Sequence, residues 1–184
     1  MSSVVILSGS PTANSRLNAF IQASCEKLAY SGIEVKTVHI AELPAKDLVR
    51  ADFQSEAIQE KVNWVKEAQA VLIASQVYQA SYTGVLKLFL DMLPQKGLHN
   101  KIVLPLFVGG SMAHLLAMDY ALKPVISALS GRHILAGVYG VDKMIARVDD
   151  GFEMDDELHQ RLQQALDELL FEMRWREAAA EKQA

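Results

Sequence analysis

Two loops contain the residues of this chain that could take part in chemistry, and each follows a short apolar run. Residues 8–16 (SGSPTANSR) place several hydroxyl groups and one arginine immediately before a helical segment. Residues 76–83 (QVYQASYT) carry Tyr78 and Tyr82 before a second helical segment. Neither loop contains an acid–base pair, a nucleophile with its base or a cluster of metal ligands. Backbone amides and flat aromatic surface suit a planar cofactor that performs its own chemistry, which indicates a flavin.

The first loop has the features of a phosphate site. It matches neither G-x-G-x-x-G nor the Walker lysine loop, so a dinucleotide pyrophosphate or a nucleoside triphosphate is not indicated. The free amides and dipole of a helix N-terminus attract a terminal phosphomonoester. The hydroxyls of Ser10, Thr12 and Ser15 could donate to it, and Arg16 could supply the counter-charge. The same residue types also cap helices, so this loop alone leaves ordinary capping open.

Alternating strand-like and helical segments must position these loops. Segments with helical spacing separate the apolar runs, and residues 156–176 form a last helix. This alternation predicts an α/β fold whose parallel sheet is covered by helices on both faces. Five strands favour a flavodoxin-like three-layer sandwich of strand order 2-1-3-4-5, which binds ligands at the carboxyl ends of its strands. The five apolar runs are residues 4–7, 34–40, 70–74, 101–108 and 134–139.

One residue conflicts locally with this assignment. Pro105 lies inside the fourth apolar run, and proline cannot donate to a strand ladder. We therefore expect a bulge or bend at Pro105.

Composition limits the class of protein. With 184 residues, 51% hydrophobic and 22% charged, the chain suits a single domain, expected over residues 1–175, with a tail at 176–184 that frays. A formal net charge of -4 argues against nucleic acid as a partner, because binding phosphates requires a basic face. The single cysteine, Cys25, cannot form an internal disulfide, which fits a reducing compartment. The longest uncharged stretch, residues 102–118, is interrupted by proline and glycine, so we expect no membrane span and a soluble, cytoplasmic protein.

Three motifs together resemble a known family. They are GSP at residues 9–11, VYQASYTGVLK at 77–87 and GGSMAHLLAMDYALKPV at 109–125. The chain resembles the NAD(P)H-dependent FMN reductases of flavodoxin-like fold, most closely those of sulfonate utilisation (the alkanesulfonate monooxygenase system). The resemblance implies reduction of FMN by NAD(P)H and delivery of the reduced flavin to a flavin-dependent monooxygenase in organosulfur assimilation. The apolar helical segment 112–129 indicates an oligomer interface, so we expect a homo-oligomer, either a dimer or a tetramer.

The resemblance assigns cofactor-binding roles to individual positions. Thr12 and Tyr82 belong to the expected site as well, although Thr12 replaces the family's usual arginine and Gln76 replaces its usual proline. The change at Thr12 places more of the expected phosphate affinity on Arg16, and Gln76 adds a backbone donor or a side-chain amide beside the flavin. Both departures bear on how tightly flavin is bound more than on which flavin it is. The implied phosphate contacts are Ser10, Ser15 and Arg16, the implied isoalloxazine-edge loop is Gln76, Val77 and Tyr78, and the second flavin loop is Gly109, Gly110 and Ser111.

Tyr120 is the remaining candidate. In the resembling group this tyrosine is associated with a local widening of its helix at a subunit contact near the flavin, and such π-bulges cluster at functional sites. We expect Tyr120 to cover the flavin and make it a transient substrate. A simple core or interface role for Tyr120 stays open.

Two other functions compete with the free-flavin reductase. The first is a quinone, azo or chromate reductase with firmly bound FMN, and the second is a flavodoxin-type electron carrier. The motif at residues 119–124 favours the free-flavin reductase over the first. A carrier usually presents a strongly acidic docking face, whereas a net charge of -4 is mild. The preference between NADH and NADPH, and among FMN, FAD and riboflavin, stays open.

Overall fold

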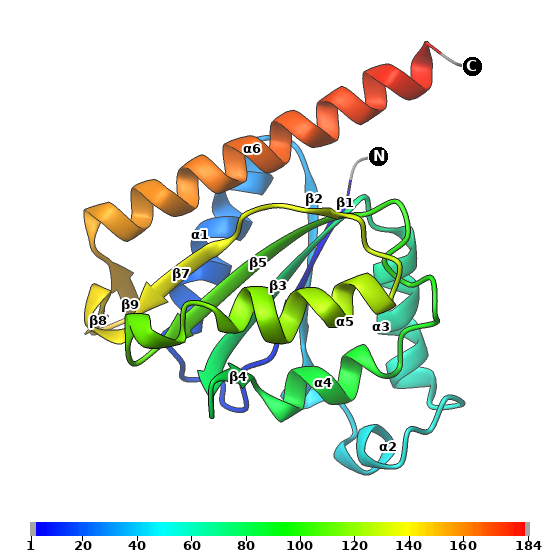
Figure 1. The fold of residues 1–184 in the computed structure, drawn as a ribbon, viewed down its shortest axis with the longest axis horizontal. Coiled ribbons are helices and arrows are strands. Elements are labelled where there is room, and N and C mark those ends of the chain that lie inside the picture. Colours follow the sequence, from blue (N-terminus) through cyan, green and yellow to red (C-terminus); the bar gives the residue numbers. More distant parts are fainter. Residues whose placement is uncertain (1–2, 183–184) are drawn as a thin grey trace.

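The computed structural model describes residues 3–182, which form a three-layer α/β sandwich (Figure 1). The main sheet has the order β2-β1-β3-β5, and both β6 and β7 lie along the outer edge of β5. Counted as the five apolar runs of the sequence, this is the predicted flavodoxin-like order 2-1-3-4-5, which is confirmed. The parallel strands are β1 (Ser3–Ser8), β2 (Glu34–His39), β3 (Ala70–Tyr78), β5 (Ile102–Gly109), β6 (His133–Ile134) and β7 (Val138–Val141).

Helices cover both faces of this sheet because the strand residues alternate between two cores. Val4 and Ile6 of β1 belong to the same buried cluster as residues of α1 and α6. Val5 and Leu7 belong to the cluster that includes residues of α3, α4 and α5. The helices are α1 (Leu17–Tyr30), α2 (Ala45–Val49), α3 (Glu56–Glu67), α4 (Gly84–Leu90), α5 (Lys123–Ala128) and α6 (Asp156–Glu181).

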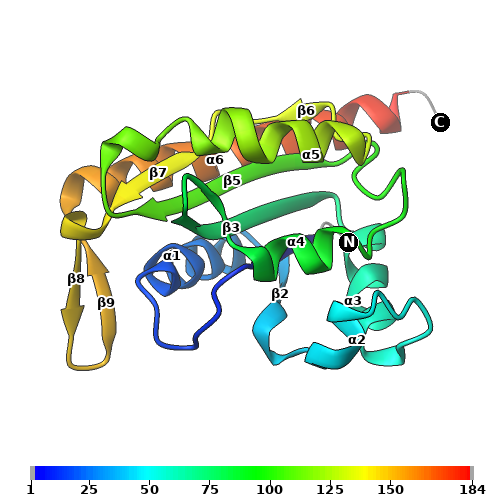
Figure 2. The ribbon, with the colours of Figure 1, turned by 60° about the horizontal axis from the view of Figure 1, so that its bottom comes forward.

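Short elements complete the chain. Strand β4 (Ser81–Tyr82) turns back along β3 as an antiparallel hairpin. Strands β8 (Ile145–Val148) and β9 (Gly151–Met154) form a second hairpin, which stands clear of the main sheet in Figure 2. The remaining turns are η1 (Ile40–Glu42), η2 (Met112–His114), the π-helical η3 (Met118–Leu122) and η4 (Asp142–Met144). Within residues 3–182, no helix is both long enough and apolar enough to cross a membrane.

The conflict at Pro105 is resolved in the neighbouring strand. Strand β5 keeps a continuous register with β3 through Pro105, so the bulge or bend expected in β5 itself is wrong. The Val103 carbonyl accepts from Leu135 N at 2.9 Å, and Pro105, two residues on, faces the same neighbour. There the fifth strand is interrupted between β6 and β7, and Gly137 adopts a φ of 85°. The interruption between β6 and β7 therefore lies beside Pro105, which has no N–H to donate to that strand.

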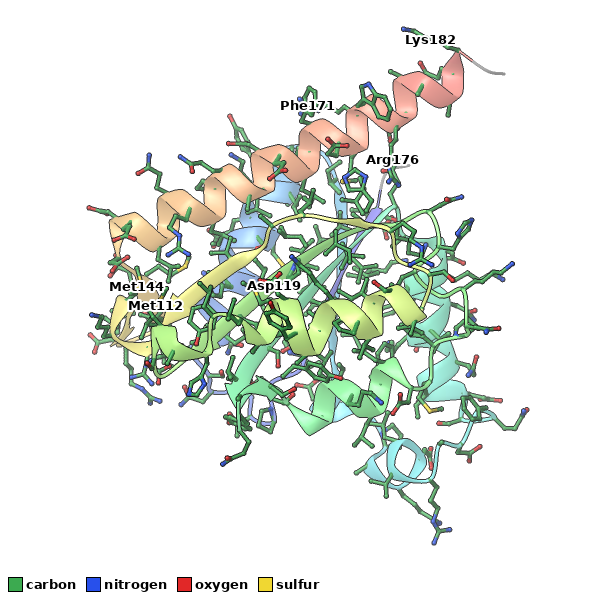
Figure 3. All side chains as sticks on the ribbon, viewed as in Figure 1. Met112, Asp119, Met144, Phe171, Arg176 and Lys182 are labelled. Carbon is green, nitrogen blue, oxygen red and sulfur yellow. The ribbon has the colours of Figure 1, made fainter. Side chains whose placement is uncertain are left out.

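The last helix is longer than the sequence analysis predicted. Helix α6 continues to Glu181, so the helix end expected near Arg176 is wrong, and residues 176–181 of the tail that was expected to fray form the last turns of this helix. The Arg176 guanidinium donates to Asn100 O at 2.7 Å and lies 2.8 Å from His133 Nδ1, which fastens this turn to the body (Figure 3). The alanines at 178–180 also favour helix. Residues 183–184 of the expected tail lie outside the described residues.

Candidate active site

A cleft of about 250 Å³ opens at the carboxyl ends of β1, β3 and β5. Its walls come from the loop after β1, the end of β3, the end of β5 and the β8–β9 hairpin. This is the edge of the sheet at which the fold class places ligands. The cleft therefore unites the two loops that the sequence analysis singled out.

The loop after β1 is held in place by backbone and side-chain contacts to β3 and α4. Gly9 N donates to Ala74 O at 2.8 Å, and Thr83 Oγ1 donates to Gly9 O at 2.6 Å. Thr83 also caps α4 by accepting from Leu86 N at 3.2 Å. A Cβ at position 9 would lie 2.7 Å from Leu86 Cβ, so only glycine permits this approach.

The hydroxyls of this first loop have different orientations. Ser10 Oγ is buried and donates to Thr12 O at 2.7 Å, so it is not among the groups that line the cleft. Ser15 and Thr12, two of the expected site residues, do line the cleft. Both serine hydroxyls accept from Gln76 Nε2, at 2.9 Å for Ser10 and 2.5 Å for Ser15. The two serines thus have different positions: Ser10 stabilises the conformation of the loop, and Ser15 lines the cleft.

Two guanidinium groups stand at this end of the cleft. Arg16, another expected site residue, lines it, and its Nε donates to Ile145 O at 3.1 Å, which directs the side chain across toward β8. Arg147, on β8, lines the cleft as well and lies 5.2 Å from the ring centroid of Phe152 on β9. With Ser15 beside them, these cations form a donor set suited to a phosphate.

The loop after β3 forms a strained hairpin. Val77 pairs with Tyr82 and Tyr78 with Ser81, which leaves a two-residue turn at Gln79 (φ 48°) and Ala80 (φ 61°). Two positive φ values match a type I′ turn, a conformation that costs non-glycine residues about 1–2 kcal/mol each. Such strain is concentrated at ligand-binding loops.

The predicted residues of this loop divide into two groups. Gln76, Val77 and Tyr78 line the cleft, and 53% of the Tyr78 side chain is exposed. Tyr82 instead packs against the core cluster of α3, α4 and α5 and is not part of the cleft wall. Burial is the main cause that raises the pKa of Tyr82 above its ordinary value, so its hydroxyl stays protonated at neutral pH.

The loop after β5 forms the floor of the cleft with two glycines, which have no side chains. Gly109 and Gly110 line the cleft, and a Cβ at Gly110 would meet nothing nearer than Asp142 Oδ2 at 3.9 Å. Ser111 lies outside the cleft wall, where its hydroxyl caps η2 by accepting from Ala113 N at 3.2 Å. Tyr139 supports the loop from below, since its Oη donates to Ser111 O at 2.7 Å. Burial, and then Asp142, raise the pKa of Tyr139, so this donor stays protonated.

Several residues of the cleft were missed by the sequence analysis. Two of the five come from the β8–β9 hairpin, where Arg147 pairs directly with Phe152. The sequence does contain a signal for this hairpin, because the turn-forming residues Asp149 and Asp150 stand directly before Gly151. The missed residues are Asn14, Val108, Asp142, Arg147 and Phe152.

Tyr120 lies on a widened helical turn, as the resemblance implied. It occupies the π-helical η3, but 79% of its side chain is exposed and it does not line the cleft of its own chain. Met112 and Leu116 are also more than half exposed on the same segment (Figure 3 labels Met112). The expected role of Tyr120 over the flavin is not tested by a single chain.

The cleft as a whole suits a phosphorylated flavin. The two arginines and Ser15 match the phosphate, and the glycine floor lets backbone amides approach the rim of a flat ring. Tyr78 offers an exposed aromatic surface beside that floor. The residues present therefore fit FMN.

Comparison with known proteins decides the family. The sequence model described as NADPH-dependent FMN reductase matches residues 2–145. The chain belongs to this family. It is an oxidoreductase whose coenzymes are FMN and NAD(P)H, as the resemblance implied.

Individual relatives agree with this membership. The chain is 43% identical over 143 residues to an FMN reductase (NADPH) of Pseudomonas putida KT2440, covering 78% of this chain and 73% of that protein. It is 34% identical over 140 residues to the NADH-dependent FMN reductase SfnF of Pseudomonas putida, covering 74% and 75%. Among solved structures, an NADH:FMN oxidoreductase (EMOB) in its apo form superposes with a TM-score of 0.81 at 34% identity, covering 91% and 88%.

Proposed function

We propose that the chain reduces free FMN with NAD(P)H and delivers the reduced flavin to a flavin-dependent monooxygenase in sulfonate assimilation. The observation that carries this proposal is the cleft itself, which is small, open and floored by Gly109 and Gly110. An open cleft suits a flavin that enters and leaves. The resemblance of residues 77–87 and 109–125 to the sulfonate-utilisation group supports the choice of partner.

In this proposal the side chains bind and orient while the coenzymes react. Arg16, Arg147 and Ser15 hold the phosphate, and the amides beside Gly109 and Gly110 contact the rim of the ring. Bound flavin supplies the chemistry, because its ring accepts a hydride from the nicotinamide. Half-buried Tyr82 and buried Tyr139 both have a pKa raised by burial and keep their protons, so neither serves as a base.

We also propose that the chain works as a homo-oligomer, either a dimer or a tetramer, in the cytoplasm. Met112, Leu116 and Tyr120 expose apolar surface on one segment, and a second copy of the chain would remove it from water. In such an assembly Tyr120 would reach a flavin that it does not approach within its own chain. This arrangement would place the π-helical turn at the subunit contact.

Three measurements on the purified protein test the proposal. We expect a colourless oligomer on gel filtration, oxidation of NAD(P)H that depends on added FMN, and sulfite release when an alkanesulfonate monooxygenase and its substrate are supplied. A yellow dimer that needs no added FMN would support the bound-flavin reductase instead. A yellow monomer without NAD(P)H oxidase activity would support the electron carrier.

A further inference from the structure

The side chain of Gln76 links the end of β3 to the first loop. Backbone pairing between β1 and β3 ends at Ser8 and Ala74, two residues before Gln76. Beyond that point the side-chain amide of Gln76 connects β3 to the first loop, because its Nε2 donates to Ser10 Oγ at 2.9 Å and to Ser15 Oγ at 2.5 Å. One side chain therefore contacts both buried serines of the predicted phosphate loop.

The hydrogen bonds of Ser10 fix the orientation of this amide. Ser10 Oγ donates its proton to Thr12 O at 2.7 Å, so the group that approaches it from Gln76 has to be a donor. The nitrogen therefore faces the serines, and Oε1 faces away. Within residues 3–182 this buried oxygen has no hydrogen-bond partner. An unpaired buried acceptor is unfavourable, so the contacts to the serines determine how the amide lies.

These contacts also determine what Ser15 can do. Its Oγ accepts from Leu17 N at 3.2 Å and from Gln76 Nε2 at 2.5 Å. A hydroxyl has two acceptor positions and one proton, so both acceptor positions are filled and only the proton is left. Ser15 lines the cleft beside Arg16, where that proton can meet an incoming acceptor. Ser15 is thereby restricted to donating.

We propose that Gln76 is a positioning residue that makes Ser15 a dedicated donor to the FMN phosphate and so lets the loop select phosphorylated flavins. The inference rests on the proposed binding of phosphate at the first loop. A phosphate carries close to two negative charges at neutral pH and offers strong acceptors, which a fixed donor matches. Without Gln76, the Ser15 hydroxyl is free to accept from water and turn its proton away. Riboflavin has no phosphate and does not use this contact.

Two substitutions separate the donor from the bulk of the side chain. Gln76→Leu removes the amide, and Gln76→Glu keeps the shape but replaces the donor with a carboxylate that accepts the Ser15 proton and repels phosphate. Dissociation constants for FMN and riboflavin are measured by quenching of flavin fluorescence, with thermal melting to verify the fold. We expect FMN binding to weaken about 10-fold in the leucine variant and about 100-fold in the glutamate variant. Riboflavin binding should change less than about 2-fold, and in turnover the loss should fall on the KM for FMN more than on kcat.

A double substitution tests whether Gln76 acts through Ser15. Ser15→Ala should weaken FMN binding by itself, and Gln76→Leu should add little in that background, because the donor it positions is gone. Gln22→Leu is the matched control, since Gln22 is an exposed glutamine on α1 whose Nε2 donates to Glu26 Oε1 at 2.9 Å, away from the cleft.

Several results would overturn the inference. Equal weakening of FMN and riboflavin would place the effect of Gln76 on the ring or the ribityl chain, and additive losses in the double variant would separate it from Ser15. Unchanged FMN binding in Gln76→Glu would also refute it. A wild-type protein that binds FMN no better than riboflavin would refute the proposed phosphate site itself.

Discussion

Gly109 and Tyr139 should be energetically coupled, because the two residues compete for the same space beneath the cleft. A Cβ at position 109 would lie 2.1 Å from Tyr139 Oη and 3.0 Å from Tyr139 Cζ. Only 1% of Tyr139 is exposed, so its ring cannot move into solvent. The backbone at Gly109 has no left-handed φ, and the penalty for Gly109→Ala is therefore steric. Overpacking of this kind should destabilise the fold by about 2–3 kcal/mol.

Removing the tyrosine hydroxyl should relieve most of that penalty. Tyr139→Phe removes the Oη that an alanine Cβ at position 109 would overlap, together with the 2.7 Å hydrogen bond to Ser111 O. Because Ser111 is exposed, its carbonyl can bind water instead, and the single substitution should cost about 1 kcal/mol. In the phenylalanine background the alanine Cβ meets the ring carbon at 3.0 Å and Val77 Cβ at an ordinary 3.5 Å, and the cost of Gly109→Ala should fall to about 1 kcal/mol. The double variant should thus lose about 1.5 kcal/mol less than the two single losses combined.

Urea unfolding of the four proteins at one fixed protein concentration measures this coupling. Gly110→Ala is the matched control, because its Cβ would meet only Asp142 Oδ2 at 3.9 Å. That control should keep its stability within about 0.5 kcal/mol and yet weaken FMN binding, since the methyl group would enter the cleft. Losses that add within about 0.5 kcal/mol would show that Tyr139 does not confine the loop, and the reasoning would be wrong.

Four further substitutions test other parts of the structure. Ala80→Gly should raise the free energy of unfolding by about 1 kcal/mol in urea titrations, because Ala80 has a φ of 61°, and an unchanged midpoint would contradict the strain. Arg16→Met should raise the KM for FMN about 10-fold and leave that for riboflavin unchanged, and an equal effect on both would exclude a phosphate contact. Burial lowers the pKa of Lys101 below its ordinary 10.5, so between the lowered pKa and 10.5 the unfolded chain binds more protons than the folded chain, and the free energy of unfolding rises with pH. From pH 7 to 10.5 the free energy of unfolding of the wild type should therefore rise relative to that of Lys101→Met, and a constant difference would refute this. Tyr120→Ala should retain FMN through gel filtration, whereas a colourless variant with normal turnover would remove Tyr120 from the flavin site.

The fold was predictable from sequence because its signals are local and redundant. Apolar runs such as residues 70–74 are buried on both faces of the sheet, and this property fixed both the strand count and the parallel arrangement. The effect of Pro105 was not predictable, because the strand that is interrupted, β6–β7, lies about thirty residues later in the chain and only the strand pairing shows that it is the neighbour of Pro105. The extra turns of α6 likewise depend on a remote contact, from Arg176 to Asn100.

The site was predicted less completely than the fold. Glycines at 109 and 110 and the cluster of hydroxyls at residues 10–15 are visible as composition, and they do lie at one edge of the sheet. The inward turn of Ser10 depends on its bond to Thr12, which residue type does not reveal. Arg147 reaches the cleft only because a hairpin folds back from a segment far along the chain.

The β8–β9 hairpin gives the cleft one wall that is built separately from the sandwich. Arg147 and Phe152 lie beyond residue 145, where the match to the family model ends. Its turn, Asp149-Asp150, is exposed and pairs with no strand of the main sheet. Insertions at this turn, or exchanges of exposed residues such as Arg147, can therefore alter which flavins and nicotinamides are admitted without repacking either buried layer, so divergence among relatives should concentrate there.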